Sequence, residues 1–242
     1  MGRASERTLS VVMPAYQLGD AIEGNIATVF EVLAPLEPQV IVVDDGSTDD
    51  TWQAISRAAE RAPDLVTVRL SENRGKGRAL LSGWQEATGD DIVFLDADLD
   101  LPPDQIPDLL ERLDDADIVV GTKRTSMAGG AYPGVRRILS RVFALLTGGM
   151  FRLPVSETQT GLKAFRREVL DEIADKVRID RYAFDIELLV RAHAAGFVMV
   201  EAPVRLGSGA AESSLRPSMM WNLAIDTARI AWWRLTEPGF KR

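Results

Sequence analysis

The sequence predicts an α/β fold in which a mainly parallel sheet carries helices on both faces. Short apolar runs alternate with longer segments whose apolar residues recur every three or four positions, which is typical of strands joined by crossover helices. Two of the apolar runs end directly in clusters of aspartate. Because ligands of open α/β sheets bind beyond the carboxyl ends of the strands, these clusters predict a functional site at one edge of the sheet.

The first half of the chain divides into regular strands and helices. The first strand is β-branched and stops at Pro14, and Ser47, Thr48 or Asp49 can cap the helix after the second strand. The predicted strands are Leu9–Met13, Val40–Val43, Val66–Leu70, Ile92–Leu95 and Ile118–Val120. The predicted helices between and after them are Ile22–Leu33, Thr51–Arg61, Ala79–Thr88 and Gln105–Leu113.

The second part of the chain is less regular. Ala128–Gly134 and Gly207–Arg216 are small or polar stretches that we expect to be loops. The other predicted elements are the helix Val135–Leu146, the strand Leu162–Phe165, the helix Phe184–Ala195, the strand Val198–Leu206 and the helix Met219–Leu235. The first and last of these helices combine arginines with large apolar residues, which suits a membrane interface. Packing into the core or a dimer contact are the alternatives.

Composition narrows the class of protein. The 242 residues are enough for one large domain or two small ones, and an apolar content of 46% is that of an ordinary globular chain. The absence of cysteine and the single histidine, His193, exclude thiolate and multi-histidine metal sites. The net charge of −8 argues against a nucleic-acid partner. With no apolar leader and no run of about 18 apolar residues, we expect a cytoplasmic protein.

The acidic run after the fourth strand is the strongest chemical signal. Asp96, Asp98 and Asp100 stand at alternate positions, and their hard oxygens suit Mg²⁺ or Mn²⁺, which often bridges protein carboxylates to substrate phosphates. One such run would be an ordinary solvated turn. A second acidic turn, at Asp44 and Asp45, follows the second strand, so the two turns can meet at one crevice. Their convergence favours a nucleotide site.

A basic, glycine-containing segment, Asn73–Arg78, opens the third predicted helix. It lacks the spacing of a Walker loop and of the dinucleotide fingerprint. Its free amides and Lys76 suit a phosphate or a ribose at a helix amino end. A solvated glycine turn is the alternative.

Taken together and in this order, the motifs resemble those of GT-A-fold glycosyltransferases of family 2, and within them the polyprenyl-phosphate (dolichol-phosphate type) hexosyl and N-acetylhexosaminyl synthases. The resemblance runs from about Leu9 to Leu235. The segments that carry it are Val12–Tyr16, Val42–Asp49, Asn73–Gly77, Asp96–Asp98, Gly121–Arg124, Thr158–Lys163 and Phe184–Leu189. It implies one domain over 1–242, with a nucleotide-sugar-binding half (9–125), an acceptor half (126–216) and a C-terminal amphipathic helix (217–242).

The resemblance implies a nucleotide-sugar donor, either a UDP-sugar or GDP-mannose, bound with Mg²⁺ or Mn²⁺. The implied donor-binding residues are Pro14, Ala15, Tyr16, Asp44, Asp45, Ser47, Arg74, Gly75, Lys76, Asp96 and Ala97. The implied metal ligands are Asp96, Asp98 and Asp100. Asp100 is a departure, because related synthases often have a glutamine at this position. The segments Thr158–Lys163 and Phe184–Leu189 look more like those of glucosyl-type relatives, so a UDP-sugar is favoured.

The implied acceptor is polyprenyl phosphate, whose charge of about −1.5 to −2 makes it a nucleophile that needs positioning rather than a strong base. The candidates to hold it are Arg124, Arg136, Arg137, Ser140 and Arg205, and the catalytic set is Asp98, Arg124, Arg136 and Asp185. The family's Glu-Ser-Lys-like segment is Glu212–Ser214 here and lacks its lysine, for which Arg216 can substitute. The resemblance therefore implies a protein on the cytoplasmic membrane surface, docked peripherally or through a separate membrane partner.

Two other functions are compatible with the same motifs. In the first, the acceptor is a soluble saccharide or a cell-wall glycan, and Asp185 or Glu187 acts as general base, because a hydroxyl acceptor must lose a proton. In the second, the chain is a non-catalytic subunit that binds a nucleotide sugar.

Overall fold

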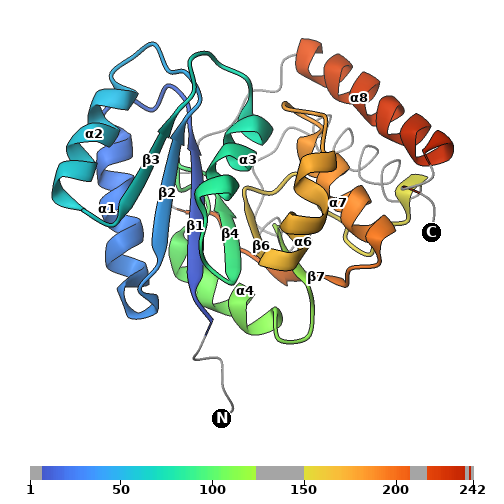
Figure 1. Ribbon diagram of the computed structural model, residues 1–242, viewed down its shortest axis with the longest axis horizontal. Coiled ribbons are helices and arrows are strands. Elements are labelled where there is room, and N and C mark those ends of the chain that lie inside the picture. The colour runs from blue at the N-terminus through green and yellow to red at the C-terminus, as the bar shows by residue number, and fades with distance from the viewer. Residues whose placement is uncertain (1–6, 124–149, 208–216, 238–239, 241–242) are drawn as a thin grey trace.

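The computed structural model describes residues 7–123, 150–207, 217–237 and 240. In these ranges one seven-stranded sheet has the order β3-β2-β1-β4-β6-β5-β7. Figure 1 shows β3, β2, β1, β4 and β6 side by side in this order. The strands are β1 (Leu9–Ala15), β2 (Gln39–Asp44), β3 (Leu65–Arg69), β4 (Asp91–Leu95), β5 (Ile118–Thr122), β6 (Leu162–Arg166) and β7 (Met199–Pro203). Neighbouring strands are parallel except that β6 runs antiparallel to β4 and β5. The predicted mainly parallel sheet is confirmed.

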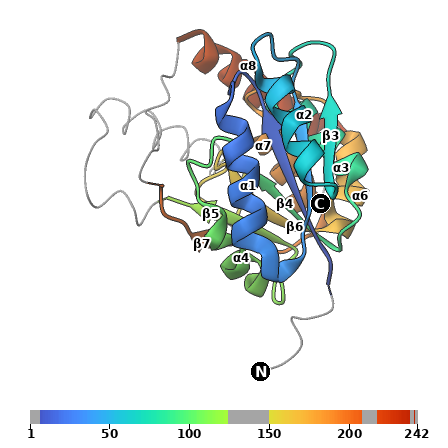
Figure 2. The same ribbon diagram turned by 90° about the vertical axis from the view of Figure 1, so that its left-hand side faces the viewer.

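Helices cover both faces of the sheet (Figures 1 and 2). They are α1 (Ala21–Leu33), α2 (Thr51–Arg61), α3 (Lys76–Glu86), α4 (Ile106–Arg112), α6 (Arg167–Ile173), α7 (Phe184–Ala195) and α8 (Pro217–Thr236), with short 3-10 turns at Ala34–Leu36, Pro103–Gln105 and Ala174–Lys176. Successive strand residues point to opposite faces. Thus Val11 and Met13 pack with α1, α2 and α4, whereas Val12 packs with α3, α6 and α7. The strands are buried on both sides, which explains their continuous apolar runs.

Most element boundaries lie within one residue of the predicted ones, and α2 and α7 agree at both ends. The predicted end of the first strand is wrong, because β1 runs through Pro14 to Ala15 and pairs there with β2. The helix α6 was not predicted. Its seven residues follow β6 without a loop, so they are too few for a helical period to emerge. The predicted helix Val135–Leu146 and the loop Ala128–Gly134 lie outside the described residues, as does nearly all of Gly207–Arg216. None of the helices that the structure describes combines the length and apolarity needed to cross a bilayer.

The strand order creates a switch point beside β4. From β1 the chain proceeds to β2 and β3 on one side and returns to β4 on the other. Ligands of such sheets bind at the carboxyl ends of the strands where the order reverses. The segment that leads into β6 reaches the same edge, because Leu95 at the end of β4 pairs with Leu162 at the start of β6.

Candidate active site

The backbone of the acidic turn after β4 is held by hydrogen bonds to two other parts of the chain. The amide of Asp96 donates to the carbonyl of Gly161 at 3.0 Å, and Nδ2 of Asn25 donates to the carbonyl of Ala97 at 2.8 Å. Within the turn, the amide of Asp100 donates to Oδ1 of Asp98 at 3.1 Å. Ala97 is buried, whereas Asp98 is exposed. The turn is therefore fixed while one carboxylate faces solvent.

Asp96 forms an ion pair with Lys76 at the start of α3. Its Oδ1 lies 2.5 Å from Nζ of Lys76, and the two side chains are 33% and 36% exposed. Burial alone would lower the pKa of Lys76, but Asp96 and Asp185 outweigh it and raise that pKa. Burial likewise opposes the charge on Asp96, and Lys76 reverses this effect so that the pKa of Asp96 is lowered. Both groups are therefore charged at neutral pH.

Asp45 holds the loop that precedes α3. Its carboxylate accepts hydrogen bonds from the amides of Arg74 and Gly75, each at 2.8 Å, and from Nδ2 of Asn73 at 3.0 Å. Gly46 makes this approach possible, because its φ is +65° and a Cβ there would lie 2.3 Å from the backbone of the loop. The acidic turn after β2 and the basic segment before α3, which are far apart in the sequence, are thus joined by hydrogen bonds. A direct contact of Asp45 with a nucleotide stays a prediction.

Four backbone amides of the segment Asn73–Arg78 are bound within the protein, and for these the prediction of free amides is wrong. The amides of Gly77 and Arg78 donate to the carbonyl of Asp180 at 2.9 and 3.3 Å, and those of Arg74 and Gly75 are engaged by Asp45, as above. The pattern of the sequence could not reveal this because Asp180 lies about a hundred residues further on. Lys76 remains as the group that this segment presents at the strand ends.

The other predicted donor residues lie along the ends of β1 and β2. The amide of Asp45 donates to the carbonyl of Ala15 at 2.8 Å, and Tyr16 is 43% exposed just beyond. Asp44 is fully buried, and its Oδ1 accepts from the amide of Ser47 at 3.0 Å. The structure therefore brings the predicted residues of both strands to the edge that carries Asp96.

A buried ion pair that the sequence did not reveal lies behind this edge. Lys163 on β6 donates from Nζ to Oδ1 of Asp185 and to the carbonyl of Thr160, both at 2.6 Å, and its side chain is 2% exposed. Burial lowers the pKa of Lys163, and Asp185 counteracts this in part. The sequence feature that could have indicated this ion pair is a lone lysine within an apolar strand. Asp185 itself was predicted, but as part of the catalytic set rather than as the partner of a lysine.

Glu187 has a structural role, because its carboxylate is bound by groups of the protein itself. It is fully buried, and its carboxylate accepts from the amides of Arg178 and Ile179 at 2.9 and 2.8 Å and from Nε of Arg191 at 2.8 Å. A carboxylate with these charge-assisted bonds and no access to solvent is not placed to act as general base. Of the two bases considered for a hydroxyl acceptor, Asp185 is the one left.

Among the predicted acceptor residues, the structure describes only Arg205. Its Nη1 lies 3.2 Å from Oδ1 of Asp104, and its amide donates to Oε1 of Gln105 at 2.7 Å. The amide of the nearby Gly207 donates to the carbonyl of Asp100 at 2.8 Å, so Arg205 lies near the acidic turn. The remaining predicted residues, Arg124, Arg136, Arg137 and Ser140, lie outside the described ranges, as do Glu212–Ser214 and Arg216.

The residues at the turn fit a divalent cation that is bound partly by the protein and partly by the oxygens of a substrate. In the described parts of the chain, no three histidine or carboxylate side chains form a metal-binding group, so Asp96, Asp98 and Asp100 do not form the expected complete set. The carboxylate of Asp96 forms an ion pair with Lys76. The pKa of Asp98 is raised, first by partial desolvation and then by the charges of Asp96 and Asp100. A cation relieves such crowding, and Mg²⁺ and Mn²⁺ use one or two carboxylates together with phosphate oxygens.

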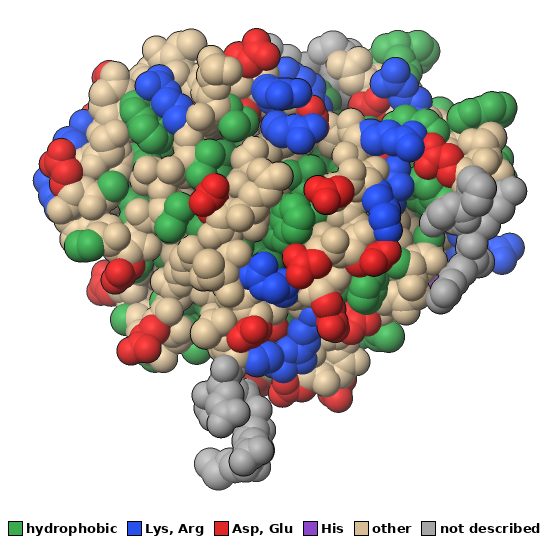
Figure 3. All heavy atoms as spheres, in the orientation of Figure 1, with side chains coloured by type: hydrophobic (Ala, Val, Ile, Leu, Met, Phe, Trp, Pro, Cys, Tyr) green, Lys and Arg blue, Asp and Glu red, His purple; other side chains and the backbone are tan. Residues whose placement is uncertain are grey.

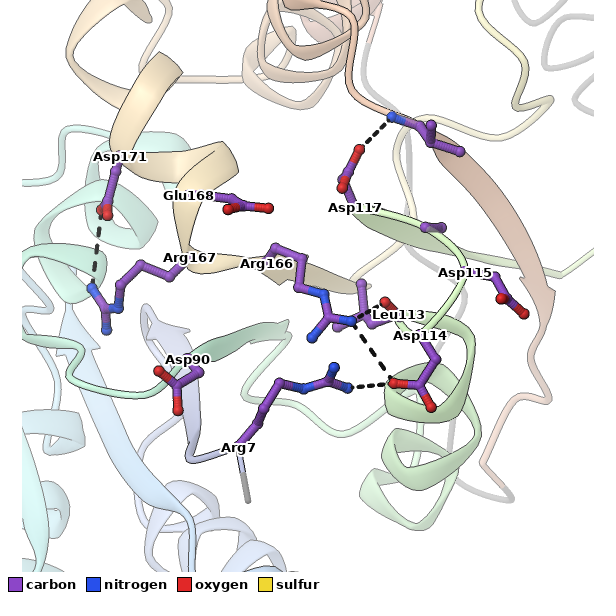
Figure 4. Close-up of a pocket in the computed structure, with 12 residues that line it drawn as sticks. Arg7, Asp90, Leu113, Asp114, Asp115, Asp117, Arg166, Arg167, Glu168 and Asp171 are labelled. Carbon is purple, nitrogen blue, oxygen red and sulfur yellow. Dashed lines mark hydrogen bonds and ion pairs between the residues drawn. The ribbon is translucent and has the colours of Figure 1, made fainter. Parts of the chain in front are cut away.

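A pocket of about 730 Å³ lies at the opposite edge of the sheet, where the parallel strands begin (Figure 4). Three arginines and six carboxylates line it, and the arginines are engaged within the protein: Nη2 of Arg7 lies 2.9 Å from Oδ1 of Asp114, and Nη1 of Arg166 lies 3.1 Å from Oδ1 of the buried Asp91 beside the pocket. The pocket is therefore remote from the acidic turn, and its lining is acidic overall.

The helix α8 exposes a stripe of large apolar side chains. Trp221, Ile225, Trp232 and Leu235 are 70, 43, 66 and 71% exposed, and their spacing of four, seven and three places them on one helix face. Ile230, on the opposite face, is fully buried. Figure 3 shows apolar and basic side chains side by side over this helix. Large exposed apolar patches mark surfaces that contact a partner or a membrane.

Comparison with known proteins identifies the family. The family model "Glycosyl transferase family 2" matches residues 10–174, and the chain belongs to this family. It is 28% identical over 234 residues to a dolichol-phosphate mannosyltransferase of Pyrococcus furiosus, covering 93% of this chain and 64% of the relative. It is 31% identical over 220 residues to glycosyltransferase AglD of Haloferax volcanii, covering 84% of this chain and 35% of the relative. The chain thus spans between about a third and two-thirds of these relatives' length.

Solved structures share the fold. Glucosyl-3-phosphoglycerate synthase of Mycobacterium tuberculosis, in complex with Mn²⁺, UDP and phosphoglyceric acid, matches with a TM-score of 0.71 at 22% identity, over 97% of this chain and 80% of that one. Mannosyltransferase PcManGT of Pyrobaculum calidifontis, in complex with GDP-Man and Mn²⁺, matches with a TM-score of 0.60 at 23% identity, over 98% and 72%. These matches confirm the GT-A-like α/β fold.

Proposed function

We propose that this chain is an inverting, metal-dependent glycosyltransferase that moves a hexose or N-acetylhexosamine from a nucleotide sugar to the phosphate of a polyprenol. A UDP-sugar is the favoured donor. The observation that carries the proposal is the fixed turn Asp96–Asp98 at the switch point of the sheet, with the charged Lys76 beside it. The product is a polyprenyl-phospho-sugar.

The donor half of the site supplies charge and shape for a nucleoside diphosphate. Asp98 is the exposed carboxylate that would hold Mg²⁺ or Mn²⁺, which when bound neutralises charge on the departing diphosphate. Asp96 orients Lys76 through their 2.5 Å contact. The loop that Asp45 fixes, together with Tyr16, forms the edge on which the base and ribose would lie.

The acceptor assignment draws on charge and on relatives. A phosphate monoester is already a nucleophile, so the site needs cations to position it and no strong base. This agrees with Asp185, whose carboxylate is bound by Lys163 rather than free. Two relatives named for polyprenyl-phosphate substrates support this acceptor: the dolichol-phosphate mannosyltransferase, and an undecaprenyl-phosphate 4-deoxy-4-formamido-L-arabinose transferase of Klebsiella pneumoniae, 32% identical over 169 residues and matched over 68% of this chain and 50% of its own length.

The exposed stripe of α8 supports contact with the membrane that holds such an acceptor. Tryptophans beside arginines suit the boundary between headgroups and acyl chains, and Trp232 lies two residues from Arg234. We propose that α8 rests on the cytoplasmic face of the membrane, with a separate membrane protein as the alternative partner for the same stripe.

A soluble acceptor is the second candidate function. It is favoured by the structural neighbour solved with phosphoglyceric acid, a soluble molecule that also presents a phosphate. In this case the donor half works unchanged, and only the acceptor half differs.

The test is a transfer assay with radiolabelled UDP-glucose, UDP-N-acetylgalactosamine and GDP-mannose in parallel. Each donor is offered to polyprenyl phosphate in detergent and to phosphoglyceric acid in water, with Mg²⁺ or Mn²⁺ and with EDTA. We expect label in the organic phase from one donor, lost with EDTA and with Asp98→Asn. The matched control is Asp115→Asn, an exposed aspartate at the opposite edge of the sheet. Label only in phosphoglycerate would support the second function, and no transfer to either acceptor, with donor binding intact, would refute both.

A further inference from the structure

Burial of the charged Lys163 side chain is unfavourable, and the nearby Asp185 only partly compensates for it. It lies on β6 between β4 and β5, opposite Phe94 and Val120, and its side chain is 2% exposed. Its Nζ reaches the carbonyl of Thr160 and the carboxylate of Asp185, each at 2.6 Å. Replacing a buried ion pair by apolar residues of similar volume is often neutral or stabilising. Stability alone therefore gives no reason for a lysine in this strand.

The backbone that Lys163 holds is the support of Asp96. Gly161 follows Thr160 directly, and its carbonyl accepts the amide of Asp96 at 3.0 Å. A Cβ on Gly161 would lie 2.0 Å from Oδ2 of Asp96, so the carboxylate rests against this bare backbone. A displacement of Thr160 and Gly161 must therefore displace the Asp96 carboxylate and the turn that it begins.

We infer that Lys163 is a positioning residue: its buried ammonium, anchored by Asp185, fixes the Thr160–Gly161 backbone on which Asp96 rests, and through it the metal and donor site. The inference rests on the proposed function and deepens it. It gives Asp185 the role of anchor at the start of α7. The group acts through backbone position, so its loss is felt in metal and nucleotide binding and not only in turnover.

The experiment compares three variants with the unaltered protein. Lys163→Met combined with Asp185→Asn removes both charges and leaves neither stranded. Gly161→Ala moves the support while the ion pair stays. Lys176→Met is the control, because Lys176 forms an ion pair with Glu172 at 2.5 Å in which both side chains are 55% exposed. The readouts are the thermal unfolding midpoint and the binding of Mn²⁺ in the presence of UDP or GDP, followed by the electron paramagnetic resonance signal of free Mn²⁺. Neither readout requires an acceptor.

We expect the double variant to unfold near the temperature of the unaltered protein and to bind Mn²⁺ roughly 10- to 100-fold more weakly, the usual loss when a group supporting a metal ligand is removed. Gly161→Ala should weaken Mn²⁺ binding in the same direction, and Lys176→Met should change neither readout. A folded double variant with unchanged Mn²⁺ affinity overturns the inference. If the double variant does not fold, unchanged affinity in Gly161→Ala overturns it. Intact Mn²⁺ and nucleotide binding without transfer counts against the proposed function instead.

Discussion

The bonds that Asp45 makes to the loop before α3 lead to a quantitative prediction. Asp45→Asn keeps the size of the side chain but replaces one acceptor oxygen by an NH₂ group. The carboxylate accepts from the amides of Arg74 and Gly75 at 2.8 Å and from Asn73 at 3.0 Å. The asparagine can satisfy one of the two amides with its remaining oxygen, and its NH₂ group then faces the other.

The magnitude follows from two opposing effects. Leaving one buried amide without a partner costs about 1–3 kcal/mol, and losing the charge on the remaining bonds adds about 1 kcal/mol. Against this, burial raises the pKa of Asp45, and the bonds from Arg74 and Gly75 only partly reverse the shift. The buried charge is therefore costly, and a neutral side chain avoids that cost. We expect a net loss of about 2 kcal/mol in the free energy of unfolding.

The assay is urea unfolding followed by circular dichroism, together with the affinity for UDP. Asp50→Asn is the matched control, because this exposed aspartate follows the same strand and makes no capping bond. A change there within about 0.5 kcal/mol is expected for a surface site. If Asp45→Asn unfolds like the control and binds UDP like the unaltered protein, Asp45 does not hold the loop and the reasoning is wrong.

Three further predictions test the packing and the charges. Gly77→Ala should destabilise the fold by about 1–3 kcal/mol, because its Cβ would lie 2.4 Å from the ring of Phe184 on α7. Gly24→Ala lies in open space within α1 and should instead stabilise the fold by about 0.5–1 kcal/mol. Equal effects of the two substitutions in urea unfolding would contradict this prediction. Glu187→Ala should cost about 3–5 kcal/mol, since it strands a buried arginine; a loss under about 1 kcal/mol would count against that role. The lowered pKa of Asp96 implies that stability from its pair with Lys76 is present above the ordinary aspartate pKa and is lost as pH falls through the native value. In metal-free buffer, the stability gap between the unaltered protein and Lys76→Met should therefore be constant near neutral pH and shrink in acid, and a gap that widens in acid would refute the pairing.

Local pattern was enough for most of the elements, with α6 as an exception, and for the placement of the aspartates at the carboxyl ends of the strands. The predicted bounds of α2 and α7 agree with the structure at both ends. The aspartates after β2 and β4 lie at the carboxyl ends of their strands and are linked through the segment Asn73–Lys76, which Asp45 and Asp96 both bind. The partners of these groups were beyond local pattern. The contact of Asp180 with the start of α3, and of Gly161 with Asp96, joins segments more than sixty residues apart. Only the tertiary fold decides such pairings, so the expected free amides proved to be engaged.

The antiparallel direction of β6 explains how a late segment of the chain reaches an early motif. A parallel strand beside β4 would bring its carboxyl end to the functional edge, and the residues before it would lie at the opposite edge. Because β6 runs antiparallel to β4, its start lies beside the end of β4. Gly161 therefore lies against Asp96, and Lys163 lies two residues further along β6, opposite Phe94. The reversal of one strand thus allows the second half of the chain to support the carboxylates of the first.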